Sequence, residues 1–400
     1  MEGSKAVLLV GTLDTKGAEY AYLRERLRLH GVDSILVDAG VHEPVGADPD
    51  VSLAAETRAD LAAAGDRGAA VTAMAEAAEE LTLRLWAEGR IGGVLAAGGS
   101  GGTAIATRAM RALPVGVPKL MVSTMAAGDT ADYVGASDVT MMASVTDVAG
   151  VNSVSGHILA NAAAAMAGML QAPPVELGDQ RPLIAASMFG VTTPCVTHAR
   201  EILEQRGYEV LTFHATGAGG RAMEGLMESG HLDGVLDVTT TELCDDLVGG
   251  MLSAGPDRLE AAGRLGLPQV VSVGALDMVN FGGRASVPPQ FEERNLYVHN
   301  PSVTLMRTTR EESAELGRRI ARKLSAATGP TALFLPLAGV SMIDAEGQPF
   351  HDPEADAALF EALREGLDRS VELVEMDCNV NDPEFAAAMV TKLDEYMGAR

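Results

Sequence analysis

Short apolar runs alternate with longer amphipathic stretches along the whole chain. Continuous apolar runs of about five residues that end in Gly, Asp, Ser or Thr are typical of parallel strands buried on both faces. In the first half such runs cover residues 6–10, 34–38, 93–97, 118–122 and 139–143. The stretches between them have helical length and composition, and they cover residues 17–30, 67–88, 101–112 and 152–170.

The same pattern restarts after a proline-containing linker at residues 171–182. Further strands are predicted at 183–187, 208–213, 234–237, 269–273, 302–306, 331–335 and 371–375. Further helices are predicted at 194–206, 219–229, 241–254, 310–327, 354–366 and 382–396. Strand–helix alternation implies right-handed crossovers and mainly parallel sheets. We therefore predict an α/β protein of two Rossmann-like, doubly wound domains, residues 1–180 and 181–400.

Composition and charge narrow the classes of function. Hydrophobic residues make up 47 % of the 400 residues and charged residues 21 %, which excludes global disorder. The formal net charge of −25 repels phosphate backbones and anionic lipid heads, so we expect neither nucleic acid nor a membrane as partner. The apolar run at 6–10 is too short for a signal peptide and that at 158–170 too short for a membrane span, which predicts a cytoplasmic protein.

Cysteines and histidines give no metal-site signature. Cys195, Cys244 and Cys378 are far apart in the sequence and form neither a disulfide framework nor a metal-ligand spacing. No pair of histidines has zinc-site spacing. Mg²⁺ held by one carboxylate together with nucleotide phosphates needs no such motif, and Asp14 is the candidate ligand.

The loop after the first predicted strand reads Gly11-Thr-Leu-Asp-Thr-Lys-Gly17 and lies directly ahead of a helix. Ligands of open parallel sheets bind beyond the carboxyl ends of the strands. A helix N-terminus offers free N–H groups and partial positive charge, which suit a phosphate. Lys16 adds a full charge. The alternative is that Asp14 and Thr15 only cap the helix.

Residues 98–103, Gly-Gly-Ser-Gly-Gly-Thr, follow the third predicted strand and are the sharpest anion-binding signal in the chain. Four glycines in six residues let backbone amides approach an anion without obstruction by Cβ. The alternative is a tight strand-to-helix turn, which seldom needs four glycines. The segment is not a P-loop, because no Lys-Ser/Thr pair follows its last glycine.

A second glycine loop lies in Phe213-His-Ala-Thr-Gly-Ala-Gly-Gly-Arg221 and shares the pattern G-x-G-G-x-A with residues 99–104. Asp237 closes the next strand about 20 residues after the first glycine, the spacing of a dinucleotide fingerprint. An NAD-linked enzyme that uses the Gly217 loop is therefore an alternative hypothesis. His214 is a candidate acid or base and Arg221 a candidate anion ligand, although a lone histidine is more often structural.

Other polar segments follow strands of the second half, and with His214 and Arg221 they are candidates to line one pocket. These segments are Thr239–Glu242, Gly274–Asp277 with Asn280, and Leu337–Ser341.

The motifs named above resemble one family, together with Thr-Thr-Thr-Glu-Leu at 239–243, Gly-Ala-Leu-Asp-Met-Val-Asn-Phe-Gly at 274–282 and His-Asn-Pro at 299–301. It is the ATP-binding domain family typified by the N-terminal part of the tomato mosaic virus resistance protein, an uncharacterised family of bacteria, fungi and plants. The resemblance covers essentially the whole chain.

The resemblance implies two Rossmann-like subdomains, ATP with Mg²⁺ in the N-terminal one, and self-association as a homodimer or higher homo-oligomer. It implies nucleotide contacts in three segments, made by Thr12, Asp14, Thr15, Lys16, Gly98, Gly99, Ser100, Gly101, Gly102, Thr103, Ser123 and Thr124. It implies no chemistry for the second domain.

Three functions follow as hypotheses. The first is an ATP-dependent phosphotransferase acting on a small metabolite at an interdomain cleft, with Lys16 stabilising phosphoryl charge and Mg²⁺ near Asp14. His214 and Arg221 are then candidate catalytic residues. The second is a nucleotide-binding regulatory module without turnover, and the third is the NAD-linked enzyme.

Overall fold

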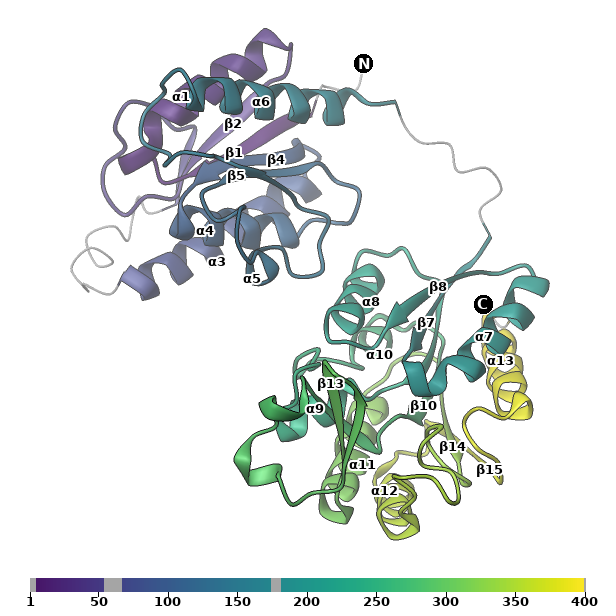
Figure 1. The fold of residues 1–400 in the computed structure, drawn as a ribbon. Coiled ribbons are helices and arrows are strands. Elements are labelled where there is room, and N and C mark those ends of the chain that lie inside the picture. Colours follow the sequence, from purple (N-terminus) through teal and green to yellow (C-terminus); the bar gives the residue numbers. More distant parts are fainter. Residues whose placement is uncertain (1–4, 54–66, 174–180, 399–400) are drawn as a thin grey trace. The chain divides into compact units, whose positions relative to one another are not determined.

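The computed structural model describes residues 5–53, 67–173 and 181–398, and Figure 1 shows their fold. The chain divides into two compact units, residues 1–176 and 177–400, which we call the N-terminal and the C-terminal unit. Within the described ranges, no helix has the length and apolar character needed to cross a membrane.

The N-terminal unit contains a parallel sheet of six strands in the order β3-β2-β1-β4-β5-β6. Strands β2 and β3 follow β1 on one side of it, and β4, β5 and β6 follow on its other side. The order therefore reverses between β1 and β4, and this is the point where open α/β sheets bind ligands. The strands are β1 (Ala6–Gly11), β2 (Ser34–Asp38), β3 (Val51–Ser52), β4 (Ile91–Gly98), β5 (Lys119–Ser123) and β6 (Thr140–Ala143).

Helices cover both faces of this sheet (Figure 1). Val7 and Leu9 of β1 pack with α1 (Leu13–Leu29) and α6 (Ser155–Gln171) on one face. Leu8 and Val10 pack with α3 (Arg67–Ala87) and α4 (Ser100–Arg111) on the other. The alternation arises because successive strand residues point to opposite faces. A short helix, α5 (Ala131–Val134), precedes β6.

Tyr20 holds β1 and β4 apart at their carboxyl ends. Pairing of the two strands ends at Leu9 and Leu95. Beyond that pair the buried Tyr20 hydroxyl accepts a hydrogen bond from the Ala97 N–H at 2.9 Å and donates to the Val10 carbonyl. Burial raises the pKa of Tyr20 well above its ordinary value. The side chain from α1 thus replaces strand pairing and opens the sheet at its switch point.

Tyr20→Phe is expected to lower the free energy of unfolding by about 1–3 kcal/mol, because it leaves buried backbone groups without a partner. Urea denaturation measures the loss. Tyr22→Phe is the matched control, since the Tyr22 hydroxyl makes one part-buried hydrogen bond to the Gly156 carbonyl at 3.2 Å. Equal losses in the two variants would contradict the role given to Tyr20.

The C-terminal unit contains a second parallel sheet of six strands, in the order β15-β14-β10-β9-β7-β8. Its order reverses between β7 and β9. The strands are β7 (Leu183–Met188), β8 (Glu209–His214), β9 (Gly234–Thr239), β10 (Gln269–Gly274), β14 (Thr331–Pro336) and β15 (Glu372–Met376). These two sheets confirm the predicted fold class of two doubly wound, mainly parallel α/β arrangements.

Helices cover both faces of the second sheet as well. One face packs against α7 (Thr193–Gln205) and α13 (Pro383–Gly398). The helices against the other face are α8 (Ala218–Glu228), α9 (Glu242–Val248), α10 (Ala261–Leu265), α11 (Arg310–Ser325) and α12 (Pro353–Gly366).

Two predictions for the second half need correction in detail. The strand predicted at 302–306 is present as β13 (Val303–Arg307), but it does not join the parallel sheet. It is central in a separate antiparallel sheet with β11 (Met278–Phe281) and β12 (Leu296–Asn300). The helix predicted at 241–254 ends at Val248, because Gly249 takes the left-handed conformation with φ of 92°. An apolar run predicts a strand but does not identify its partner.

Candidate functional site

A pocket of about 600 Å³ lies at the switch point of the N-terminal unit, where β1 and β4 end. We call it the switch-point pocket. It brings together eight residues that the sequence singled out, four after each strand. Its lining comprises Thr12, Asp14, Thr15, Lys16, Ala39, Val41, His42, Ala70, Val71, Met74, Gly99, Ser100, Gly101, Gly102, Ile105 and Asp147.

The N-terminus of α4 forms the glycine-rich wall of this pocket. The first N–H groups of a helix have no partner inside the helix, and no side chain caps α4 at Gly99. A Cβ built on Gly101 would be in ordinary contact with Val71, at 3.6 Å, and one built on Gly102 would meet nothing within 4 Å. The wall therefore consists of backbone amides with open space in front of them, which is the environment that binds a phosphate.

Lys16 supplies the cation of the pocket. It interrupts α1 with non-helical backbone angles, φ of −127° and ψ of 17°. Every other lysine of the chain has a charged or aromatic partner: Lys5 lies over Trp86, and the others pair with carboxylates, Lys119 with Asp138, Lys323 with Glu260 and Lys392 with Glu372 and Glu395. Lys16 lines the switch-point pocket and has no ion-pair partner among the residues that the structure describes.

Two carboxylates complete the polar half of the pocket. Asp14 accepts a hydrogen bond from the His42 N–H at 3.2 Å, and Asp147 comes from the loop after β6. The described part of the chain contains no group of three or more His, Cys, Asp or Glu side chains placed to hold a metal ion. A Mg²⁺ ion here would therefore take most of its oxygen ligands from a bound phosphate or from water.

Asp38 ends β2 and holds the first residue of α1. Its Oδ1 accepts hydrogen bonds from the Leu13 N–H at 3.1 Å and the Gly40 N–H at 2.9 Å, and the side chain is fully buried. In dinucleotide-binding sheets an acidic residue about 20 residues after the glycine motif bonds the ribose hydroxyls. The second oxygen of Asp38 accepts a hydrogen bond from the Ser52 hydroxyl at 3.4 Å, so both oxygens are occupied and the buried carboxylate is not free to bond a ribose.

Four of the residues expected to contact nucleotide lie outside the pocket lining. Thr103 and Ser123 are buried, and their hydroxyls lie 2.7 Å apart in a hydrogen bond beneath the glycine wall. Gly98 is buried at the end of β4, and exposed Thr124 donates its N–H to the Gly98 carbonyl at 3.3 Å. These residues support the glycine wall and do not line it.

Apolar side chains make up much of the remaining lining, which we call the apolar wall, and they were not predicted from the sequence. The apolar wall comprises Ala70, Val71 and Met74 from the first turns of α3 and Ile105 from α4, with Val41 from the loop after β2. Their spacing is that of any amphipathic helix face, so the sequence pattern does not distinguish them from core residues.

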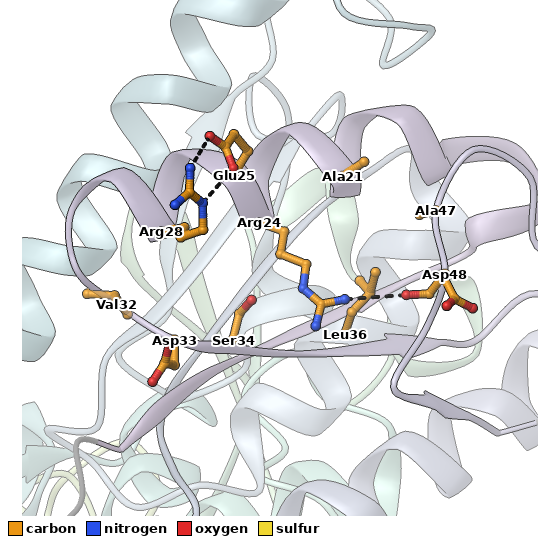
Figure 2. A pocket seen from close by; sticks show the side chains of 10 residues that line it. All are labelled: Ala21, Arg24, Glu25, Arg28, Val32, Asp33, Ser34, Leu36, Ala47 and Asp48. Carbon is orange, nitrogen blue, oxygen red and sulfur yellow. Dashed lines mark hydrogen bonds and ion pairs between the residues drawn. The ribbon is translucent and has the colours of Figure 1, made fainter.

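A second hollow of about 430 Å³ lies between α1 and the start of β2 (Figure 2). Its cations are already paired. Arg28 bonds Glu25 through two nitrogens, each at 2.8 Å, while Arg24 bonds both oxygens of Asp50 at 2.8 and 2.9 Å and the Asp48 carbonyl at 3.3 Å. Both arginines are paired and carboxylates outnumber them, so the hollow offers no positive field to an anionic ligand.

In a comparison with known proteins, both units of the chain match the domains of one protein family. Residues 5–174 match the N-terminal domain of the Uncharacterised protein family (UPF0261), and residues 181–397 match its C-terminal domain. The chain belongs to the UPF0261 family.

Its relatives include bacterial and plant proteins. A UPF0261 protein of Clostridium tetani is 51 % identical over 98 % of this chain and 99 % of its own length. The tomato mosaic virus (ToMV) resistance protein Tm-1 of Solanum lycopersicum is 39 % identical over 97 % of this chain, which spans 55 % of the plant protein. Among solved structures, a UDP-N-acetylglucosamine 2-epimerase is similar at 12 % identity over 99 % of this chain and 98 % of its own, with a TM-score of 0.25. A score this low carries no argument about function.

In the UPF0261 C-terminal domain, His214 and Arg221 do not form part of a described pocket. Both are exposed, and Arg221 donates to the Ser253 carbonyl at 2.9 Å. The polar strand ends expected to line a pocket are instead inside the protein, because Thr241, Asp277 and Ser341 are fully buried and bonded to neighbouring groups. Their hydrogen bonds join the segments that follow different strands: Thr241 bonds the Met278 carbonyl, and Ser341 bonds Asp277.

The same domain buries an ion cluster around Arg307. The guanidinium donates to Asp356 at 2.6 Å and to Asp344 at 3.2 Å. Burial, and then the neighbouring carboxylates Asp277 and Asp356, raise the pKa of Asp344 to about 9. At neutral pH the folded state therefore keeps a proton that the unfolded chain releases.

Stability is accordingly expected to fall as pH rises from 6 to 9. A carboxyl whose pKa is raised on folding stabilises the fold fully below its unfolded pKa, and loses that contribution as pH approaches the folded value. Asp344→Asn should flatten the pH dependence of the free energy of unfolding, measured with urea. The exposed Asp257→Asn should leave it unchanged. An equally steep dependence in Asp344→Asn would refute this account.

Proposed function

We propose that the N-terminal unit binds ATP with Mg²⁺ in the switch-point pocket. The observation that carries the proposal is that the uncapped, glycine-rich N-terminus of α4 and Lys16 line one pocket at the reversal of strand order. Lys16 has no ion-pair partner in the described part of the chain. Amides and a lysine provide local positive potential in a chain of net charge −25, and phosphates are the ligand chemistry that such a site favours.

The remaining lining fits the other parts of a nucleotide. Asp14 and Asp147 are hard oxygen donors that would share Mg²⁺ with phosphate oxygens. The apolar wall of Val71, Met74 and Ile105 offers a surface on which a base can pack. The volume of about 600 Å³ lies in the range of small-molecule and cofactor sites.

ATP is preferred to NAD for two reasons. Asp237, the acidic residue of the Gly217 loop on which the NAD hypothesis rests, is buried and bonded to Arg258 through both oxygens, so it is not free to bond a ribose. In addition, the sequence resembles the ATP-binding domain family typified by the tomato mosaic virus resistance protein, and this resemblance implies that ATP is the ligand. Lys16 and Asp14 are placed to stabilise phosphoryl charge, but an acceptor for that group would have to come from outside the described lining. The proposal is therefore limited to nucleotide binding, and self-association and cytoplasmic location stay predictions.

Gly102→Ala tests the pocket directly. The new methyl group would enter the open space in front of the α4 amides, so we expect the affinity for ATP with Mg²⁺ to fall at least about tenfold, or about 1.4 kcal/mol. The fold should not suffer, because alanine in a helix is more favourable than glycine by about 0.5–1 kcal/mol.

Calorimetric titration of wild type, Gly102→Ala and the control Gly168→Ala makes the measurement, with NAD titrated in parallel. Gly168 lies in α6, outside the pocket lining, and a Cβ there also meets nothing within 4 Å. Wild-type binding of NAD but not ATP, or unchanged ATP affinity in Gly102→Ala, would refute the assignment.

A further inference from the structure

The chain carries two glycine loops of the same pattern in the same structural context. Residues 99–104 and 217–222 both read G-x-G-G-x-A. The first leads from β4 into α4, and the second leads from β8 into α8. In both, the residue before the helix is a glycine without a capping side chain. The first loop lines the switch-point pocket, whereas the second faces a carboxylate of its own chain.

That carboxylate belongs to Glu242, the first residue of α9. Its Oε1 accepts hydrogen bonds from the Gly217 N–H at 2.6 Å and the Gly220 N–H at 3.0 Å. The side chain is fully buried. A Cβ built on Gly220 would lie 2.2 Å from Glu242 Oε2, so the carboxylate rests directly against the glycine backbone.

A buried arginine completes the enclosure of this group. Arg258 Nε donates to Glu242 Oε2 at 2.7 Å, and Arg258 is 1 % exposed. The carboxylate therefore has amide donors on one oxygen and a guanidinium on the other. Charge-assisted donors in this arrangement hold an oxyanion more strongly than neutral ones do.

We propose that the second glycine loop is an oxyanion site that the chain fills with Glu242, and that removal of this side chain makes it a site for a small free carboxylate. Without the Glu242 carboxylate, the Gly217 and Gly220 amides and Arg258 Nε all point at the space it vacates. The inference is independent of ATP binding in the other unit. It explains why the second loop, despite its dinucleotide-like spacing, does not offer the Gly217 and Gly220 amides to a cofactor phosphate.

Chemical rescue tests the proposal in the full-length chain. Thermal unfolding of Glu242→Ala is followed in sodium formate and in sodium chloride of equal ionic strength, beside wild type. We expect the variant to melt below wild type in chloride and to regain part of the difference as formate rises to saturation. Wild type should melt alike in the two salts. No difference between the salts for the variant would overturn the proposal.

Gly220→Ala provides a second test that keeps Glu242, in case Glu242→Ala does not fold. The methyl group would displace the carboxylate from the loop, so the melting temperature should fall. Gly225→Ala on the same helix is the matched control, because a Cβ there meets nothing within 4 Å, and its melting temperature should hold or rise. If Gly220→Ala were as stable as Gly225→Ala, the carboxylate would not be held by the loop.

Discussion

Arg258→Ala is expected to lower the free energy of unfolding by about 3–5 kcal/mol, the loss typical when one partner of a buried ion pair is removed. The guanidinium is bonded to Asp237 through two nitrogens, at 2.6 and 2.8 Å, and to Glu242 at 2.7 Å. A third carboxylate, Glu224, lies 3.3 Å away. Removing the arginine leaves these carboxylates close together without their cation.

The loss should extend beyond one pair, because the carboxylates also position backbone. Glu242 bonds the N-terminal amides of α8, and Glu224 bonds the N–H groups of Leu259 and Ala261 at 2.7 and 2.9 Å. Through these carboxylates Arg258 connects α8, α9 and the segment before α10 with β9, which contains Asp237.

Urea denaturation at neutral pH measures the effect, and Arg264→Ala is the control. Arg264 also pairs with a glutamate, Glu228, at 2.6 Å, but its side chain is 60 % exposed. Exposed pairs contribute about 0–1 kcal/mol. Losses of similar size in the two variants would mean that burial does not decide the contribution of Arg258.

The polar half of the switch-point pocket follows from local sequence. Gly99, Gly101 and Gly102 come directly after one apolar strand, and Lys16 lies close after another. Parallel strands end at the same edge of a sheet, so loops that follow neighbouring strands approach each other without further information. The strand–helix alternation predicts that sheet, and the six-stranded order confirms it.

Other features of the two units depend on contacts that local sequence does not contain. The Tyr20 hydroxyl reaches Ala97, 77 positions away, and Asp38 reaches back 25 positions to Leu13. The two glycine loops show the limit most clearly. Both have the same pattern, yet only one faces an open pocket, because Glu242, 25 positions after Gly217, fills the other. The dinucleotide-like spacing of that loop is present in the sequence, but its Gly217 and Gly220 amides are already bonded to Glu242.

The antiparallel sheet of β11, β12 and β13 also depends on contacts between residues far apart in the sequence. β13 has the apolar run of a buried strand, with Leu305 and Met306 fully inside the core. The run is equally compatible with a parallel sheet, and the antiparallel arrangement follows from long-range pairing such as that of Asn280 with Leu305.

Lys16→Ala is expected to weaken binding of ATP with Mg²⁺ by about 10- to 100-fold. A hydrogen bond to a charged group contributes about 1.5–3 kcal/mol, and each 1.4 kcal/mol changes the dissociation constant tenfold. The stability of the fold should change little, since Lys16 is only part-buried and no carboxylate depends on it for an ion pair among the described residues.

Arg24→Ala is the matched control on the same helix. Arg24 lines the hollow of Figure 2, where its charge is already neutralised by Asp50. Calorimetric titration of both variants at two salt concentrations separates a bound phosphate from a general effect of charge, because removing a phosphate contact should also reduce the salt dependence of binding. If Lys16→Ala binds ATP as wild type does, or if Arg24→Ala loses as much affinity, the nucleotide phosphates do not lie against the first turns of α1. The unpaired lysine would then be a surface charge, and the uncapped end of α4 would no longer be sufficient reason to place ATP in this pocket.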